Sequence, residues 1–329
     1  MRDVLVTENI AGLEMEVLKN TFDVVFEPDL WKSPDRLREM ISDFQSIIVR
    51  NQTKVTRDLL AAAPMLKVIG RAGAGLDNID IEAATEAGVV VVYAPEQNSI
   101  SVAELTIGMM LSLARKIVTA DHNTKSGEWK RQGFTGNELY GKTLGIVGLG
   151  RIGYRTAVRA KAFGMDIIAH DEYANPDAVM VSELRARMMH LDELLSHSDF
   201  VSCHLPLTSS TIGLFDYEKF CTMKPTAFFI NTSRGEVVDE EALTKALKDK
   251  KIAGAALDVR QQEPPVKGPL SEMDNVILTP HIGAFTEEAQ ERVVSSVCRD
   301  VADILSGKEA KNYFNFSKPK HICQKGGKI

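Results

Sequence analysis

The segment that decides the fold reads Thr143-Leu-Gly-Ile-Val-Gly-Leu-Gly-Arg-Ile-Gly153. In it a short apolar run, Leu144–Val147, leads into the pattern G-x-G-x-x-G, and an amphipathic stretch follows. We expect Gly148 to allow a tight turn, Gly150 to let a pyrophosphate approach the backbone, and Gly153 to let helix and strand pack closely. The N-terminus of the following helix would then offer N–H groups to the phosphates.

A carboxylate stands where a dinucleotide site of this kind needs one. Asp171 follows the next predicted strand and lies 21 residues after Gly150. An acidic side chain there can accept both hydroxyls of an adenosine ribose, whereas a 2′-phosphate would meet like charge. Glu172 and Tyr173 come next, so no arginine follows directly to relieve that charge. The sequence therefore predicts NAD in preference to NADP. The alternative is a glycine turn with an unrelated surface aspartate.

On both sides of this segment the chain alternates Val- and Ile-rich runs with amphipathic stretches, which is typical of parallel sheets covered by helices. The first series of predicted strands is Val4–Thr7, Val24–Phe26, Ser46–Val49, Val68–Gly70 and Val89–Tyr93. The second series is Leu144–Val147, Ile167–Ala169, Phe200–His204, Ala227–Asn231, Ala253–Leu257 and Val276–Thr279. The predicted fold class is α/β with two doubly wound parallel-sheet domains.

Two helices set the expected domain boundaries. Ser99–Ala120 repeats apolar residues every three or four positions, which predicts one long helix with a buried stripe. Glu287–Leu305 has no strand of its own to pair with, so we expect this helix to return to the first domain. A Rossmann NAD domain over 99–285 would then be inserted into a flavodoxin-like substrate-binding domain formed by 1–98 and 286–310.

Composition limits the classes of partner. The chain has 329 residues, 44% of them apolar, and a net charge of −6, which supports neither a nucleic-acid partner nor a membrane span. Its four cysteines are scattered and form no C-x-x-C pair, so we expect a cytoplasmic location without disulfides or zinc. The lysine-containing stretch 311–329 shows little periodicity and is expected to form a mobile basic tail.

Three polar residues follow predicted strand ends in the second series, where doubly wound sheets bind ligands: Arg234, Glu263 and His281. Reduction of a 2-keto acid needs a proton donor at the carbonyl oxygen, and a histidine beside a carboxylate can stay charged for that purpose. Arginine can hold a substrate carboxylate in a bidentate clamp. Taken singly, they could be a core histidine, a helix-capping ion pair and a solvated loop acid. Together they predict a dehydrogenase of a small 2-hydroxy acid.

The chain resembles the D-isomer-specific 2-hydroxyacid dehydrogenases over about Val4 to Leu305. The matching stretches are Gly148–Gly153, His204–Gly213, Asn231–Asp239, Ala255–Pro264 and Thr279–Ala284. The resemblance implies that Arg234 binds substrate, that His281 is the acid/base and that Glu263 orients and charges it. It also implies a dimer, or a dimer-based tetramer, held partly by the helix near Ser99–Ala120. Further implied cofactor contacts are Arg151, Ile152, Asp171, Thr232, Asp258 and Gly283.

The first domain resembles members of this family that act on 3-phosphoglycerate and 3-phosphohydroxypyruvate. The stretches behind this resemblance are Val49–Lys54, Gly70–Asp80, Ala94–Ser99 and Val102–Thr106. Arg50 would face the anionic C3 end of such a substrate, and Arg131 would reach the site of a neighbouring subunit, unless both are plain surface charges. The turn that would present backbone N–H groups to the substrate carboxylate consists of Ala72, Gly73, Ala74 and Gly75.

Departures from that pattern leave other substrates and functions open. Asn51 stands where a serine is common, Glu236 replaces a frequent glycine, and Arg260 occupies a position that is more often aromatic. Sulfolactate, hydroxypyruvate and glyoxylate therefore remain alternative substrates. Some members of the family are NAD-sensing transcriptional corepressors, so a binding role is a further alternative. Formate dehydrogenases share the fold, but they would have a glutamine where Glu263 stands. No regulatory domain is expected, and hence no feedback by serine.

Overall fold

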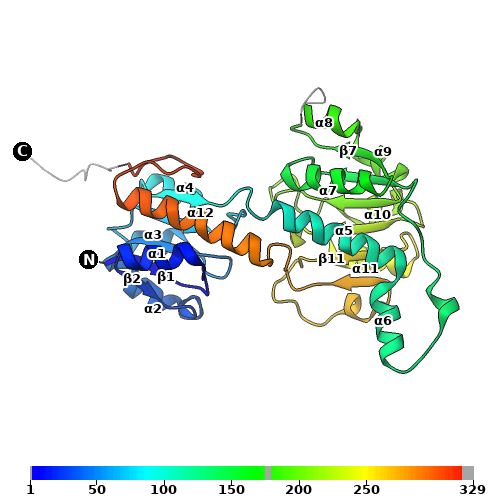
Figure 1. Cartoon of the computed structure of the whole chain (residues 1–329), viewed down its shortest axis with the longest axis horizontal. Coiled ribbons are helices and arrows are strands. Elements are labelled where there is room, and N and C mark those ends of the chain that lie inside the picture. The colour runs from blue at the N-terminus through cyan, green and yellow to red at the C-terminus, as the bar shows by residue number, and fades with distance from the viewer. Residues whose placement is uncertain (1, 175–178, 321–329) are drawn as a thin grey trace, which may run out of the picture. The chain divides into compact units, whose positions relative to one another are not determined.

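The chain divides into two α/β units, one formed by Met1–Asn98 and Phe285–Ile329 and the other by Ser99–Ala284. The computed structural model describes residues 2–174 and 179–320 (Figure 1). Each unit contains one parallel sheet, of five strands in the first and seven in the second. The predicted fold class, with two parallel α/β sheets, is confirmed by this topology.

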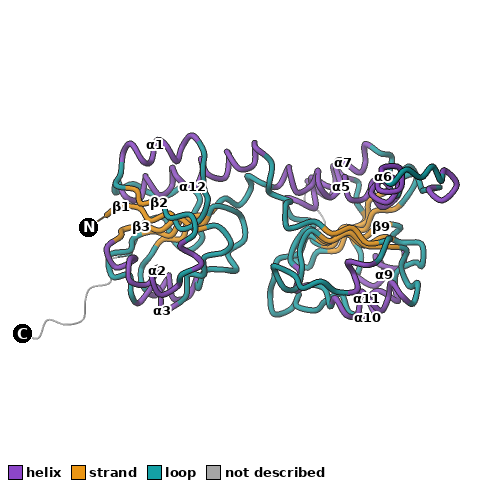
Figure 2. The backbone as a smooth tube through the Cα atoms, turned by 90° about the horizontal axis from the view of Figure 1, so that it is seen from below, coloured by secondary structure: helices purple, strands orange, loops and turns teal. Residues whose placement is uncertain are grey.

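The sheet of the first unit is built from β1 (Arg2–Val6), β2 (Val24–Phe26), β3 (Phe44–Val49), β4 (Val68–Arg71) and β5 (Val90–Tyr93). Their order is β2-β1-β3-β4-β5, which is the flavodoxin-like order. The helices are α1 (Leu13–Thr21), α2 (Pro34–Met40), α3 (Arg57–Ala61), α4 (Ile81–Glu86) and α12 (Glu287–Leu305), with 3-10 turns at Leu30–Lys32 and Ile41–Asp43. Figure 2 shows α1 and α12 on one face of the sheet and α2 and α3 on the other.

The last helix, α12, packs directly on the first sheet at Gly70 in β4. A Cβ at Gly70 would lie 2.8 Å from side-chain carbons of both Val297 and Val301. A larger residue in β4 would therefore push α12 away from the sheet. Both valines are buried, together with Val293. The helix thus belongs to the first unit, although it follows the second unit in the chain.

The expectation of a mobile tail over 311–329 is wrong for its first ten residues. Residues 311–320 run along the edge strand β5, where the N–H of Tyr93 donates to the carbonyl of Asn312 at 3.2 Å and the N–H of Phe314 donates to the carbonyl of Val91 at 2.8 Å. An edge strand carries unpaired N–H and C=O groups, and this segment satisfies them. Residues 321–329 lie outside the described part of the chain.

The sheet of the second unit is built from β6 (Thr143–Val147), β7 (Asp166–His170), β8 (Arg187–Met188), β9 (Phe200–Cys203), β10 (Phe228–Asn231), β11 (Gly254–Leu257) and β12 (Val276–Leu278). Their order is β12-β11-β10-β9-β6-β7-β8, so the direction of winding reverses between β6 and β9. In such sheets ligands bind at the carboxyl ends of the strands beside this switch point. Strand β8 is not among the predicted strands, because two residues are too short a run to show a period.

Helices cover both faces of this second sheet as well. They are α5 (Ser99–Arg115), α6 (Ile117–Lys125), α7 (Arg151–Ala162), α8 (Val179–Leu184), α9 (Leu191–His197), α10 (Tyr217–Thr222) and α11 (Glu240–Lys248), with 3-10 turns at Arg131–Phe134, Gly235–Val237 and Pro269–Glu272. Figure 2 shows α5 and α7 on one face and α9, α10 and α11 on the other.

The single long helix predicted over Ser99–Ala120 is interrupted at Lys116. This residue has a φ of 52°, in the left-handed region, and it separates α5 from α6. The returning chain packs against the end of α5, where the N–H of Asn137 donates to the carbonyl of Ala114 at 2.8 Å. Ile117 is half exposed, so the apolar spacing that reaches it does not mark one continuous buried stripe.

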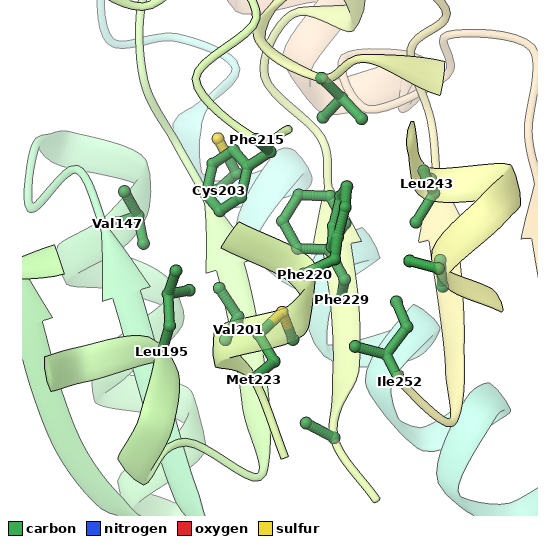
Figure 3. Close-up of a cluster of buried hydrophobic side chains, with 14 of the residues drawn as sticks. Val147, Leu195, Val201, Cys203, Phe215, Phe220, Met223, Phe229, Leu243 and Ile252 are labelled. Carbon is green, nitrogen blue, oxygen red and sulfur yellow. The ribbon is translucent and has the colours of Figure 1, made fainter. Parts of the chain in front are cut away.

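A cluster of phenylalanines fixes the strands that carry the site. Phe215, Phe220 and Phe229 are fully buried, and the ring centroids of Phe215 and Phe229 are 4.7 Å apart (Figure 3). Val201 of β9 and Leu243 of α11 belong to the same cluster. Burying a side chain of this kind contributes roughly 1.5–3 kcal/mol. The core therefore holds β9, β10 and α11 in a fixed relation, and the loops after these strands start from defined positions.

Candidate active site

The glycine-rich turn lies between β6 and α7, where the winding of the second sheet reverses. Gly148 has a φ of 94°, and a Cβ there would lie 2.8 Å from the carbonyl oxygen of His204, just after β9. A Cβ on Gly153 would overlap the carbonyl oxygen of Gly148, whereas one on Gly150 would meet no atom within 4 Å. The first and third glycines therefore serve packing, and Gly150 leaves open space at the N-terminus of α7.

Asp171 lies beside this turn. Its Oδ2 accepts a hydrogen bond from the N–H of Leu149, within the turn, at 2.8 Å. Its Oδ1 accepts from the N–H groups of Tyr173 at 2.8 Å and Ala174 at 3.0 Å. Arg151 and Ile152 begin α7. An open helix N-terminus with a carboxylate next to it fits the diphosphate and the ribose of NAD.

His281 and Glu263 are in hydrogen-bonding contact at the carboxyl edge of the same sheet. Nδ1 of His281, after β12, lies 2.8 Å from Oε2 of Glu263, after β11. The two side chains are 39% and 34% exposed. This contact fixes the orientation of the imidazole ring and turns Nε2 away from Glu263. The pair therefore presents one ring nitrogen to a ligand while the carboxylate supports the other.

Asp258 holds the loop that carries His281. This carboxylate, at the end of β11, is 1% exposed. Its Oδ1 accepts from the hydroxyl of Thr279 at 2.6 Å and the N–H of Ile282 at 2.8 Å, and its Oδ2 accepts from the N–H of Gly283 at 2.8 Å. His281 itself has a φ of 56°, a conformation that costs energy and persists only where surrounding bonds enforce it. Both oxygens of Asp258 are thus directed at the loop around His281.

Arg234 stands in the turn after β10, and Asn231 ties that turn together. Nδ2 of Asn231 donates to the carbonyl of Arg234 at 2.8 Å, and its Oδ1 accepts from the N–H of Ser233 at 3.0 Å. Nη1 of Arg234 donates to the carbonyl of Ser233 at 2.7 Å. Thr232, a predicted cofactor contact, is buried with its hydroxyl 3.1 Å from that of Thr106 in α5.

The electrostatics of the site keep Glu263 ionised. Burial of this carboxyl works to raise its pKa, but the hydrogen bond and charge of His281, the N–H of Arg260 and the charge of Arg234 together hold the pKa below the ordinary glutamate value. Gly235, next to Arg234, packs against the carbonyl of Arg260 in the loop that carries Glu263. The turn of Arg234 and the Glu263–His281 contact therefore lie in one region of the second unit. A proton-exchanging imidazole, a fixed carboxylate and a guanidinium can together bind a carboxylate and move a proton.

Arg50, in the first unit, follows β3 in a loop held by Glu8. The buried Glu8 carboxylate accepts from the N–H groups of Arg50 at 2.8 Å and Thr53 at 2.9 Å, as well as from the two residues between them. The Arg50 guanidinium donates to Gln290 and lies 5.6 Å from the ring centroid of Phe285. Burial lowers the pKa of Arg50, and the charge of Glu8 opposes that shift.

The turn Ala72–Gly75 follows β4 in the same unit and contains an arginine contact that the sequence analysis missed. The guanidinium of Arg71 occupies the place that a Cβ on Gly73 would take. The N–H of Ala72 donates to the carbonyl of Val49 at 2.7 Å, which links this turn to the strand before Arg50. The sequence could have indicated Arg71 as a functional residue, because it stands at the end of a predicted strand and directly before a glycine-rich turn.

Residues 107–283 match the family described as D-isomer specific 2-hydroxyacid dehydrogenase, NAD binding domain. The chain belongs to this family. The predicted resemblance and the predicted cofactor, NAD, are thereby confirmed. The glycine-rich turn, Asp171 and the Arg234–Glu263–His281 region all lie within the matched residues.

Two dehydrogenases named for the same substrate are similar to this chain. The D-3-phosphoglycerate dehydrogenase of Methanocaldococcus jannaschii is 46% identical over 329 residues, which are 100% of this chain and 62% of that protein. The D-3-phosphoglycerate dehydrogenase of a Synechocystis strain is 43% identical over 96% of this chain and 56% of that protein. The chain thus spans about three fifths of the length of these relatives.

Solved structures share the fold over nearly the whole chain. A protein from Thermus thermophilus superposes with a TM-score of 0.89 at 34% identity, over 94% of this chain and 99% of that one. A glyoxylate reductase from Paecilomyes thermophila gives a TM-score of 0.84 at 32% identity, over 95% and 98%. Among the residues that the structure describes, no cluster of His, Cys, Asp and Glu could hold a metal ion, and no helix is long and apolar enough to cross a membrane.

Replacing Asp171 tests whether this residue determines the preference for NADH over NADPH. Asp171→Ala should weaken the use of NADH and narrow the gap to NADPH, because it removes the hydroxyl acceptor and the charge that repels a 2′-phosphate. Steady-state kinetics with both cofactors measure the effect, and Asp166→Ala at the exposed start of β7 is the matched control. Equal losses with both cofactors would instead mean that Asp171 serves only to hold the turn at Leu149.

Proposed function

We propose that this chain is an NAD-dependent D-2-hydroxyacid dehydrogenase that interconverts 3-phosphoglycerate and 3-phosphohydroxypyruvate. The observation that carries the proposal is the 2.8 Å contact between His281 and Glu263 at the carboxyl edge of a dinucleotide-binding sheet. Arg234 lies in the turn after the neighbouring strand β10.

The residues proposed to hold the cofactor are those of the glycine-rich turn. Gly150 with Arg151 and Ile152 at the start of α7 would bind the diphosphate, and Asp171 would accept the ribose hydroxyls. When bound, NAD accepts a hydride from C2 of the hydroxy acid or returns it to the keto acid. Thr232, Asp258 and Gly283 are proposed to line the same cofactor site. For Asp258 this role would be indirect, through the loop it holds.

His281 is proposed to exchange the proton at the C2 oxygen. In the reducing direction the charged imidazole donates a proton from Nε2 to the carbonyl oxygen, and in the oxidising direction the neutral ring takes it back. Glu263 remains ionised and holds Nδ1, so that one tautomer and one ring orientation are kept. Arg234 is proposed to bind the C1 carboxylate and to polarise the C2 carbonyl.

The proposed substrate carries a second anionic group on C3, which needs a cation. In the first unit Arg50 follows β3 and Arg71 ends the neighbouring strand β4. Of the predicted turn Ala72, Gly73, Ala74 and Gly75, the N–H groups of Ala72 and Gly73 already donate to the carbonyls of Val49 and Arg71, so the N–H groups proposed to bind the substrate are those of Ala74 and Gly75. The similarity to two D-3-phosphoglycerate dehydrogenases supports the phosphorylated substrate. Sulfolactate would need the same cations, whereas hydroxypyruvate and glyoxylate would not.

We also propose that the chain works as a homodimer in the cytoplasm, alone or as half of a tetramer. Helix α6 buries none of its residues, and Ile117, Val118 and Trp129 are exposed, the last at 78%. Exposed apolar side chains on one helix and in the loop after it are typical of a protein–protein interface. The three cysteines that the structure describes are free, as expected in a reducing compartment.

His281→Ala tests the proposed proton transfer. It should lower kcat on the order of 10²–10⁴-fold, the usual contribution of general acid–base catalysis, and leave NADH binding intact. Turnover is measured with 3-phosphohydroxypyruvate, and cofactor binding is measured by NADH fluorescence. The control is His197→Ala, which removes an exposed imidazole from α9. A loss below tenfold would exclude His281 as the proton donor.

Arg50→Ala tests the anion site. Removing one partner of a desolvated charge pair costs about 3 kcal/mol or more, so kcat/KM should fall roughly 100-fold for phosphorylated or sulfonated substrates. For glyoxylate and hydroxypyruvate the loss should be much smaller. Arg36→Ala, which removes an exposed arginine of α2, is the matched control. Equal losses for both classes of substrate, or a wild-type preference for substrates without a charge on C3, would overturn the assignment.

A further inference from the structure

The loop that carries Glu263 is anchored by an ion pair between Arg260 and Glu240. Nε and Nη2 of Arg260 donate to the two oxygens of Glu240, the first residue of α11, at 2.9 and 2.6 Å. The two side chains are only 12% and 19% exposed. A bidentate arginine–carboxylate contact fixes both position and angle, and here it is largely withdrawn from water.

The same carboxylate also binds the backbone of the loop. Oε1 of Glu240 accepts from the N–H of Gln261 at 2.7 Å. The N–H of the preceding residue, Arg260, donates to Oε1 of Glu263 at 3.0 Å, and Oε2 of Glu263 contacts Nδ1 of His281 at 2.8 Å. A continuous series of hydrogen bonds therefore leads from the start of α11 to the imidazole of His281.

The loop also rests on the turn that carries Arg234. A Cβ on Gly235 would overlap the carbonyl group of Arg260 and would lie 2.5 Å from the nitrogen of Gln261. Only glycine lets the two backbones approach this closely. A displacement at 260–261 would thus reach Glu263 through its hydrogen bond and Arg234 through direct backbone contact.

We propose that Arg260 and Glu240 are positioning residues for the Glu263–His281 pair, holding the loop so that the Glu263 carboxylate meets Nδ1 of the imidazole. The proposal rests on the proposed function, in which that pair moves the proton. It also gives a role to Arg260, which departs from the aromatic residue more common at this position in the family. A plain stabilising ion pair would connect two side chains, whereas this one also fixes backbone N–H groups next to the reacting residues.

Glu240 has to be ionised for this role. Its burial works to raise the carboxyl pKa, but the hydrogen bond from Arg260, the N–H of Gln261 and the charge of Arg260 hold the pKa below the ordinary value. Replacing Glu240 by the neutral glutamine keeps one acceptor oxygen for the loop backbone but loses the bidentate contact. Replacing Arg260 by lysine keeps the charge but loses the planar fork.

The test compares Glu240→Gln and Arg260→Lys with Glu241→Gln, which removes an exposed carboxylate from the next position of α11. A misplaced catalytic group costs on the order of 10–100-fold, so kcat for the reduction of the keto acid should fall by that factor with a smaller change in KM. The pH above which the reduction rate declines should also move to lower pH. NADH binding and the control variant should stay within about twofold of the wild type.

A double-variant cycle separates positioning from simple stabilisation. If Glu240 acts mainly through Glu263, then Glu240→Gln added to Glu263→Gln should lower kcat by a much smaller factor than Glu240→Gln does alone. Additive losses, or a lowered melting temperature with unchanged kcat and pH profile, would overturn the proposal. In ¹⁵N-histidine spectra the hydrogen-bonded signal of His281 Nδ1 should be lost in Glu240→Gln and kept in Glu241→Gln. This readout needs no turnover, so it decides the proposal even if the wild type reduces no 2-keto acid, an outcome that would defeat only the proposed function.

Discussion

The geometry of this protein's loops depends on hydrogen bonds from backbone N–H groups to carboxylates at the carboxyl ends of the two parallel sheets. Asp258 shows the constraint most clearly, because its buried carboxylate accepts three hydrogen bonds from the loop that carries His281. A buried carboxylate is unfavourable unless such bonds replace its lost hydration. Loops also lack the regular backbone partners that strands and helices have. The three hydrogen bonds therefore stabilise the buried carboxylate of Asp258 and also fix the loop that positions the imidazole of His281.

The pattern recurs at three further loops that carry proposed functional groups. Asp171 holds the glycine-rich turn at Leu149, Glu240 holds the loop of Glu263, and Glu8 holds the loop of Arg50. Because all strands of a sheet run in the same direction, their carboxyl ends share one edge, and the loops of each unit gather along the edge of that unit's own sheet. For Glu240 and Glu263, N–H groups and neighbouring cations hold the pKa of the carboxyl below its ordinary value. In each unit, hydrogen bonds to a carboxylate thus fix the backbone of loops that carry proposed functional side chains.

The sequence predicted much of this arrangement, because periodic apolar runs mark strands and because polar residues at strand ends are informative in a doubly wound sheet. It did not predict the strand β8, the break at Lys116 or the pairing of residues 311–320 with β5. The three aromatic residues Tyr313, Phe314 and Phe316 could have indicated that this segment packs on the domain, but the lysines around them suggested a mobile tail. Glu8 and Glu240 were missed for a physical reason. Their partners lie 20 to 45 residues away in the sequence, and hydrogen bonds to the backbone leave no trace in the identity of the residues that donate them.

The titration of Glu263 tests the central claim, that strand-end loops hold an ionised carboxylate against His281. The carboxyl carbon of Glu263 can be followed by ¹³C NMR between acidic and neutral pH, in the wild type and in His281→Gln. We predict that the wild-type Glu263 titrates below the ordinary glutamate range, since the bond and charge of His281 outweigh the effect of burial. Without the histidine, burial has less to oppose it, and the pKa of Glu263 should rise. A wild-type value above the ordinary range, or one that does not move when His281 is replaced, would contradict the account.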